Sequence, residues 1–178
     1  MLSRAFANDP AMSFIFPDPV QRARRMPRLF GLLFDSDALA GLRLTTAGGE
    51  AATLWRGPGQ VHTSRAEMLR QAAPMLAAFG TALRRALALS DSIAGHMPRG
   101  AFWYLHIAGC DPDRQGSGLG AAAVQAGLAR VAGRLPCYLE TATESNLGFY
   151  ARLGFTVTDE WCVPRGGPRF WSMVRRPD

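Results

Sequence analysis

The sequence predicts a mixed α/β domain with helices flanking one sheet, and three observations lead to this. A strand–loop–helix–strand run after Gly100 indicates two parallel strands joined by a crossover. Two earlier strand-like segments on either side of a glycine turn indicate an antiparallel hairpin, and two more strand-like segments end the chain. With 178 residues, 48% of them hydrophobic, the chain can bury one core, and its length does not require a second domain.

The first part of the chain is expected to be helical. Asp18 followed by Pro19 is typical of an N-cap with proline in the first helical position, and Pro27 is expected to kink this helix. An apolar stripe supports the same helix and consists of Val20, Leu29, Phe30, Leu32, Leu33 and Phe34.

A hairpin and two helices follow. Residues 41–46 and 50–55 have strand character, and the turn Ala47-Gly48-Gly49 between them favours antiparallel pairing. Ser64-x-x-Glu67 is a capping box that predicts a helix start, and Pro74 is expected to bend or divide that helix. One side of this helix is apolar, with Met68, Leu69, Ala72, Met75, Leu76 and Phe79. A further helix is expected over about 81–93, ending at Gly95.

The pattern then changes. Residues 102–108 have strand composition, 118–131 have helical spacing, and 137–141 predict the second strand of the crossover. The remaining elements are expected to be a short helix near 146–153, strands near 155–163 and 170–174, and a turn at Gly166-Gly167-Pro168 between those strands.

The most informative stretch is the loop Gln115-Gly116-Ser117-Gly118-Leu119-Gly120, hereafter the glycine loop. Three glycines in five positions leave backbone amides uncovered by side chains. If Gly118 opens a helix, these amides point together at its positive end. Such a loop is typical of a phosphate or pyrophosphate site.

Two other interpretations of this loop remain open. Gly116-x-Gly118-x-x-Ala121 meets the relaxed dinucleotide-binding fingerprint, and Glu140 lies where a ribose-binding acid would be. Two observations count against this interpretation. The dinucleotide motif places its first glycine directly after a strand, whereas residues 111–114 separate the expected strand from Gly116. In addition, only 58 residues follow Gly120, which are too few for a complete doubly wound fold. Alternatively, the loop only turns the chain.

The composition of the chain argues against several classes of partner and site. All 20 basic residues are arginines spread along a chain of net charge +6, a bias more typical of a GC-rich genome than of a binding surface. Neither nucleic acid nor a membrane is therefore expected as a partner. Cys110, Cys137 and Cys162 lack C-x-x-C spacing, so no disulfide framework and no metal site is expected, and a cytoplasmic location fits. No apolar leader or run of about 18 apolar residues occurs, so neither secretion nor a membrane span is predicted.

Two motifs lie in the second half of the chain, separated by one expected helix and one expected strand: Gln115-x-x-Gly118-x-Gly120 and Asn146-x-x-x-Tyr150-x-x-x-Gly154-Phe155. Together they resemble the core signatures of the GNAT superfamily of acetyl-CoA-dependent N-acetyltransferases. The similarity is close over about residues 102–176, where it looks particularly like puromycin N-acetyltransferase and its bacterial relatives, and it is looser before. The resemblance implies a mixed, mostly antiparallel sheet with a splayed parallel pair of strands.

This resemblance implies acetyl-CoA as co-substrate. The family holds the coenzyme pyrophosphate on the amides of the glycine loop. It also threads the pantetheine arm between strands that splay at a bulge just before this loop. Gly109 fits a bulge or a close backbone approach. The residues expected to bind the coenzyme are Ala108, Gly109, Cys110, Gln115, Gly116, Ser117, Gly118, Leu119, Gly120, Asn146 and Tyr150.

Three side chains are candidates for catalysis. Tyr150 matches the family tyrosine that protonates or hydrogen-bonds the leaving sulfur. Glu140 is the leading base, since a partly buried carboxylate can have a raised pKa, and His106, on one strand face with Tyr104, is the other candidate. Each also has a purely structural interpretation: a packed tyrosine, a glutamate that caps the strand or pairs with arginine, and a core histidine. Asn146 either contacts the pantetheine arm or caps a helix.

The expected function is direct transfer of acetyl to the primary amine of a small molecule in a ternary complex, because Cys110 lacks a local histidine partner for an acyl-enzyme. Residues 1–100 would form the acceptor side of one domain, 1–178, and 101–178 its acetyl-CoA-binding core. The acceptor pocket is expected to form from the N-terminal helices and the turn 55–62, with Trp55, Phe14 and Phe16 as apolar lining candidates. The alternative function is a non-catalytic acyl-CoA-binding sensor or interaction module.

The chain departs from the family at its start. A GNAT domain opens with a strand before its first helix, whereas helical sequence begins here almost at once, at residues 5–10. Either the expected sheet lacks its first strand, or the sequence starts after it. An uncovered edge favours pairing with a second subunit, and a homodimer would cover it.

Overall fold

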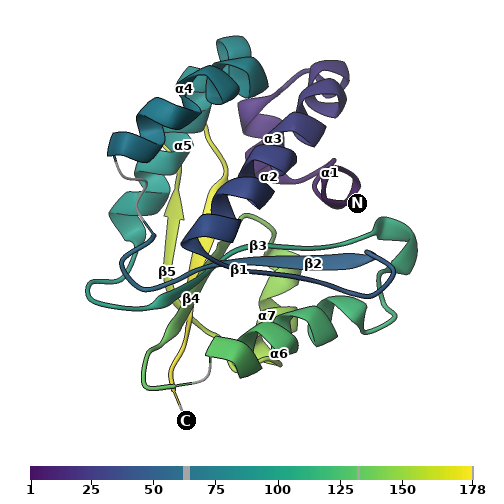
Figure 1. Ribbon diagram of the computed structural model, residues 1–178, viewed down its shortest axis with the longest axis vertical. Helices are drawn as coiled ribbons and strands as arrows, with labels where there is room; N and C mark the ends of the chain where they lie inside the picture. The colour runs from purple at the N-terminus through teal and green to yellow at the C-terminus, as the bar shows by residue number, and fades with distance from the viewer. Residues whose placement is uncertain (62–64, 132, 178) are drawn as a thin grey trace.

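The computed structural model describes residues 1–61, 65–131 and 133–177 (Figure 1). One six-stranded sheet has the order β1-β2-β3-β4-β6-β5. Only β3 and β4 pair in parallel, and the other neighbouring pairs are antiparallel. The strands are β1 Gly41–Thr45, β2 Ala51–Arg56, β3 Trp103–Cys110, β4 Cys137–Thr141, β5 Thr156–Cys162 and β6 Arg169–Arg175. The expected hairpin and crossover are both confirmed.

Helices cover both faces of this sheet. Figure 1 shows α1 to α5, drawn purple to teal, on one side and α6 on the other. The helices are α1 Leu2–Ala5, α2 Pro10–Ile15, α3 Pro19–Ala40, α4 Arg65–Phe79, α5 Leu83–His96, α6 Leu119–Val131 and α7 Leu147–Ala151. Short 3-10 turns lie at Gly80–Ala82, Pro112–Arg114 and Glu144–Asn146. No described helix has the length and apolar character needed to cross a membrane.

Local signals explain where several helices begin. The Asp18 carboxylate accepts a hydrogen bond from the Val20 amide at the start of α3, as the Asp-Pro pair predicts. Pro27 lies inside α3 and Pro74 inside α4, and neither proline divides its helix. Ser64, the first residue of the predicted capping box, lies outside the described residues, so that cap is not tested.

The core has two main parts. Between the sheet and α6 and α7, a cluster includes Trp55, Val124, Leu139 and Phe155. On the other side, α2, α4 and α5 pack apolar residues against β5 and β6, including Phe79 and Phe170. The sheet thus separates two layers of helices. Each layer is held mainly by burial of apolar surface.

The parallel strands separate soon after they meet. β3 pairs with β4 only through Trp103 with Cys137 and Tyr104 with Tyr138, although both strands continue further. Among the described residues before β1 the chain forms only α1 to α3, and β1 is an edge strand. The predicted splay is therefore present, and it opens toward the glycine loop.

The bulge lies at His106 rather than at Gly109. Leu54 pairs with Ile107 and Trp55 with Leu105, which leaves His106 as the extra residue of β3. Gly109 pairs regularly with Ala52. A Cβ at position 109 would lie 2.8 Å from Leu2 Cδ2, so side chains of α1 pack closely over Gly109. The predicted bulge is therefore displaced to His106, and the atoms nearest to Gly109 belong to side chains rather than to another backbone segment.

Candidate active site

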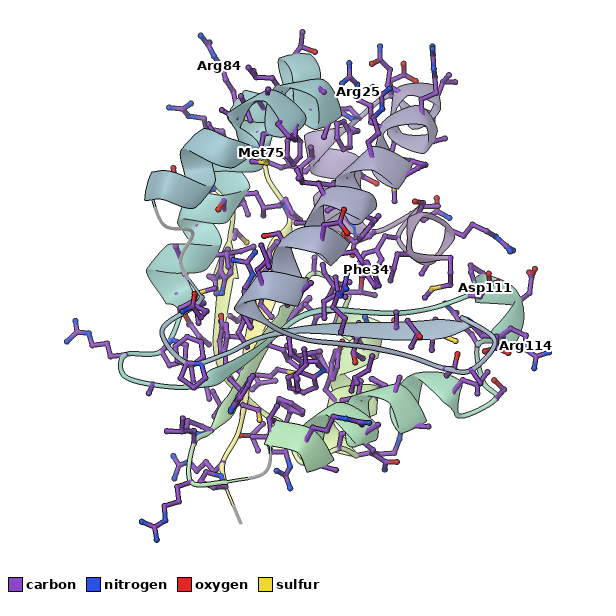
Figure 2. The ribbon with its side chains drawn as sticks, in the orientation of Figure 1. Arg25, Phe34, Met75, Arg84, Asp111 and Arg114 are labelled. Carbon is purple, nitrogen blue, oxygen red and sulfur yellow. The ribbon has the colours of Figure 1, made fainter. Side chains whose placement is uncertain are left out.

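One large cavity of about 1510 Å³ runs from the glycine loop to the helices of the acceptor side. Arg114 lines it near the tip of the loop after β3, and Met75 of α4 lines it among the helices (Figure 2). Tyr150, Glu140 and His106 all line the same cavity. The fold therefore brings the three candidate catalytic side chains together, although they come from α7, β4 and β3.

The glycine loop has the backbone that its sequence predicts. Gly116 and Gly118 have φ of +79° and +82°, values that disfavour any side chain, and α6 begins immediately afterwards at Leu119. Residues 115–118 are exposed, so their amides are accessible. An exposed helix N-terminus of this kind suits an anionic group.

Most of the predicted coenzyme residues border the cavity. Gly116, Gly118 and Gly120 line it together with Gln115, whose Nε2 lies 3.5 Å from the Cys110 carbonyl oxygen. Two others are not among the described lining residues, namely Ser117 and Leu119. The Ser117 hydroxyl instead donates to the Arg114 carbonyl oxygen within the loop. The rest of the predicted set lines the cavity, namely Ala108, Gly109, Cys110, Asn146 and Tyr150.

Glu140 lies at the splay. Its Oε1 accepts a hydrogen bond from the Tyr104 hydroxyl, whereas its buried Oε2 has no hydrogen-bond partner within the described part of the chain. Burial raises the pKa of Glu140 to about 7, although the hydrogen bond from Tyr104 and the nearby Tyr138 hydroxyl act in the opposite direction. Among the described residues no arginine forms an ion pair with Glu140. A carboxylate with this pKa can take up a proton near neutral pH.

Tyr150 is almost buried, at 8% exposure. Its ring packs against Phe149 and Phe155, with ring centroids 5.0 and 5.9 Å away. Burial, followed by the charges of Glu140 and Asp9, raises the pKa of the Tyr150 phenol far above its ordinary value. The phenol therefore stays protonated and can act as a hydrogen-bond or proton donor toward the cavity.

Asn146 precedes α7 without capping it. Its side chain makes no capping hydrogen bond, and its Nδ2 donates to Thr141 Oγ1 at 3.3 Å. Asn146 therefore occupies the N-cap position of α7 without the side-chain hydrogen bond that a capping role requires. The link to Thr141 ties the start of α7 to the end of β4, on the cavity wall.

His106 is held by residues that sequence reasoning missed. Its Nδ1 lies 2.7 Å from Oδ2 of Asp37 in α3, and the other carboxylate oxygen accepts from Nε of Arg56 at 2.7 Å. Asp37 lies far from His106 in sequence, and no motif contains it. The only available signal was a charged residue near the end of an otherwise apolar helical stripe, which is too weak to interpret.

The N-terminal helices and two residues of the predicted turn, Arg56 and Val61, do line the cavity, whereas the three predicted aromatic residues do not. Trp55 is fully buried on the opposite face of the sheet, where a Cβ added at Gly127 of α6 would meet its ring at 2.4 Å. Phe14 and Phe16 pack into the core between α2 and α5, and His62 lies outside the described residues. The apolar lining comes instead from α2 to α5, including Met12, Ile15, Leu33, Met75, Phe79 and Leu83.

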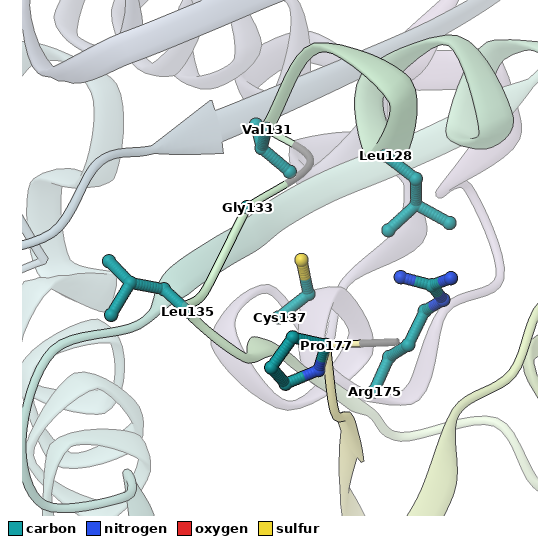
Figure 3. Close-up of a pocket in the computed structure, with 7 residues that line it drawn as sticks. All are labelled: Leu128, Val131, Gly133, Leu135, Cys137, Arg175 and Pro177. Atoms are coloured by element: carbon teal, nitrogen blue, oxygen red, sulfur yellow. The ribbon is translucent and has the colours of Figure 1, made fainter.

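A smaller cavity of about 210 Å³ lies beyond the C-terminal end of α6 (Figure 3). It is lined by Leu128, Val131, Gly133, Leu135, Cys137, Arg175 and Pro177, and no predicted site residue is among them. Burial raises the pKa of the Cys137 thiol to about 11, so this cysteine is a poor nucleophile. The candidate active site is therefore the large cavity.

No protein-family model matches the chain. Among solved structures, a Corynebacterium glutamicum protein described as histone acetyltransferase HPA2 and related acetyltransferase is 26% identical, with a TM-score of 0.73 over 99% of this chain and 87% of that one. Arylalkylamine N-acetyltransferase 2 from Aedes aegypti is 11% identical, with a TM-score of 0.58 over 99% and 91% of the two chains.

The polyamine N-acetyltransferase of Drosophila melanogaster has the same fold at 16% identity, with a TM-score of 0.52 over 98% of this chain and 90% of that one. The Aedes and Drosophila structures support the fold alone, whereas the Corynebacterium structure also resembles this chain in sequence. Both signature motifs lie beside one cavity at the splayed strands. By the arrangement of its sheet and helices, its two motifs and its likeness to the Corynebacterium acetyltransferase, the chain has the GNAT acetyltransferase fold.

Proposed function

We propose that this enzyme transfers the acetyl group of acetyl-CoA to the primary amine of a small molecule with an apolar body. The observation that carries the proposal is the continuity of the large cavity. The glycine loop lies at one end, Glu140 and Tyr150 lie along it, and apolar side chains of α2 to α5 line the other end. Coenzyme and acceptor can therefore approach each other from opposite ends.

The coenzyme end suits a diphosphate on a flexible arm. A Cβ at Gly116 or Gly118 would meet no protein atom within 4 Å, so the space beside these amides is open to a ligand. Beyond Tyr104, β3 is not paired with β4. Its backbone on that side can therefore hydrogen-bond the amide groups of the pantetheine arm.

Glu140 is the proposed general base. A pKa of about 7 leaves a large fraction of its carboxylate ionised at neutral pH, and the unpartnered Oε2 provides an acceptor for an N–H proton. Tyr150, which keeps its proton, would donate it to the departing thiolate. The reaction needs no covalent enzyme intermediate, since the amine attacks the thioester carbonyl directly.

The acceptor end favours an amine with an apolar body. Met12, Met75, Phe79 and Leu83 contribute apolar surface there, and burial of such surface stabilises an alkyl or aryl group. Proteins that share this fold include some named for arylalkylamines and polyamines, which supports a small amine as acceptor.

The decisive test is thiol release from acetyl-CoA with a panel of primary amines. We expect turnover for at least one apolar amine, with product mass increased by one acetyl group. Tight coenzyme A binding without thiol release for any acceptor would instead favour a non-catalytic acyl-CoA-binding module. A larger rise in melting temperature with NAD than with acetyl-CoA would favour the dinucleotide interpretation of the glycine loop.

A further inference from the structure

Asp37 connects three elements around a buried charge. Its side chain is fully buried, at 0% exposure. Oδ1 accepts from Nε of Arg56 in β2 at 2.7 Å, and Oδ2 lies 2.7 Å from Nδ1 of His106 in β3. Arg56 also donates from its terminal nitrogen to Ser36 Oγ at 3.1 Å. Arg56 and His106 line the large cavity, whereas Asp37 lies behind them and is not among its lining residues.

The charge on Asp37 determines which nitrogen of His106 carries the proton. Burial alone would raise the pKa of Asp37, but His106 and Arg56 outweigh it, and the pKa is lowered. An ionised carboxylate can only accept hydrogen bonds, so Nδ1 of His106 must donate. In the neutral ring, Nε2 is then left with its lone pair available to the cavity. The His106 side chain is 20% exposed, so this nitrogen is not sealed in the core.

The acceptor nitrogen loses two protons when it arrives as an ammonium. An alkylammonium must lose one proton before its nitrogen can attack, and the nitrogen loses a second when the amide forms. Glu140, enclosed at the splay, can hold only one of these protons at a time. Tyr150 is a donor and accepts none at neutral pH. A second base on the cavity wall can carry the first proton to solvent and leave Glu140 free for the second.

We propose that Asp37 is a positioning residue that holds His106 as the Nδ1–H tautomer, and that His106 Nε2 removes the first proton from the acceptor ammonium. This rests on the proposed function. The free amine then forms the N–C bond as the C–S bond breaks, and Glu140 takes the second nitrogen proton. Tyr150 protonates the thiolate and recovers its proton from Glu140, while the imidazolium releases its proton to solvent. The balance is one ammonium and one thioester converted to one amide, one thiol and one proton.

The surroundings of His106 suit this role. Asp37 from α3 and Arg56 from β2 compensate each other, and the Tyr104 ring from β3 lies 5.2 Å from the imidazole, centroid to centroid. Tyr104 in turn donates to Glu140 of β4. The two bases are thus on neighbouring strands with one tyrosine between them. Tyr104 and His106 are two residues apart in β3, so strand alternation places both rings on one face.

Nitrogen-15 NMR of the histidine side chains tests the tautomer without any acceptor. The chain has only three histidines, and the spectrum of His106→Asn identifies the signal of His106. We expect neutral His106 to be protonated at Nδ1, and Asp37→Asn to shift it toward the Nε2–H form. A wild-type signal protonated at Nε2 would overturn the proposal, even if every variant were inactive.

Kinetics with two amines test the proton step. We expect His106→Asn to lower kcat/KM for 2-phenylethylamine about 100-fold at pH 8 and Asp37→Asn to lower it about tenfold or more. The 2,2-difluoro analogue of this amine is largely uncharged at pH 8. For this analogue, kcat/KM should fall only about twofold in either variant. Equal losses for both amines would contradict the proposed role of His106.

A double-mutant cycle separates positioning from general stability. If Asp37 acts through His106, Asp37→Asn should cause no further loss in the His106→Asn background. Additive losses would show that Asp37 supports only the fold. Asp35→Asn is the matched control, since Asp35 lies in the same helix but is exposed, 3.7 Å from Arg43. If no amine yields thiol with the wild-type protein, the proposed function fails, whereas the NMR result still tests the tautomer.

Discussion

Tyr104 donates a hydrogen bond to Glu140 at the last position where β3 and β4 still pair. The bond joins the two strands just before they separate. It also opposes the effect of burial on the Glu140 carboxyl, which has a pKa of about 7. The strength of the proposed base therefore depends on a residue of the neighbouring strand.

Tyr104→Phe should make Glu140 titrate at higher pH. The Tyr104 hydroxyl lowers the pKa of Glu140, so its removal should raise that pKa above about 7. Because the ionised carboxylate is the active form, the acid limb of kcat/KM should move to higher pH, and activity should fall most at pH 6 to 7. A pH profile from about 5.5 to 9 measures this shift. An unmoved acid limb would argue that Glu140 is not the titrating base.

Glu140 should also make the protein less stable as pH rises. Its pKa is about 7 in the folded protein and 4.5 as the ordinary value, so the folded state retains the proton over this interval and the unfolded state does not. The free energy of unfolding should therefore fall by about 3 kcal/mol between pH 4.5 and 7.5 from this group alone. Urea unfolding at several pH values should show a correspondingly smaller fall in Glu140→Gln. Parallel curves for the two proteins would be inconsistent with a buried, protonated Glu140.

Tyr150→Phe should reduce turnover without weakening the coenzyme complex. The Tyr150 hydroxyl makes no hydrogen bond to the described residues, so its removal should cost little stability. We expect kcat to fall about 100-fold, while the Kd for acetyl-CoA changes by about twofold or less. Isothermal titration and steady-state kinetics on the same preparation separate the two quantities. Unchanged turnover would remove Tyr150 from the mechanism.

Gly118→Val should abolish coenzyme binding. Valine disfavours φ of +82° and would place a branched side chain beside the amides that we assign to the pyrophosphate. Gly49→Val is the matched control, because Gly49 has φ of +73° in the hairpin turn and also has open space around it. Both variants should lose a similar amount of stability in thermal unfolding. Only Gly118→Val should lose binding of acetyl-CoA, and equal binding by both variants would place the coenzyme elsewhere.

Local patterns in the sequence determined the order of the elements and the glycine loop. The Asp18-Pro19 start of α3, the glycine turn between β1 and β2, and the positive φ of Gly118 depend on neighbouring residues only. Such preferences can be read from a short window because backbone sterics and capping act over a few residues. Tyr150 of the second motif and Glu140, which precedes that motif, line the same cavity.

Only the tertiary structure decided which face each strand residue occupies. One extra residue in a strand reverses every later side chain, so the bulge at His106 could not be placed by alternation alone. The structure also shows that Trp55 faces α6 rather than the acceptor, and that Asp37 meets His106 although 69 positions separate them in the chain. Contacts between distant segments depend on register and packing of the whole sheet, which short-range sequence preferences do not encode.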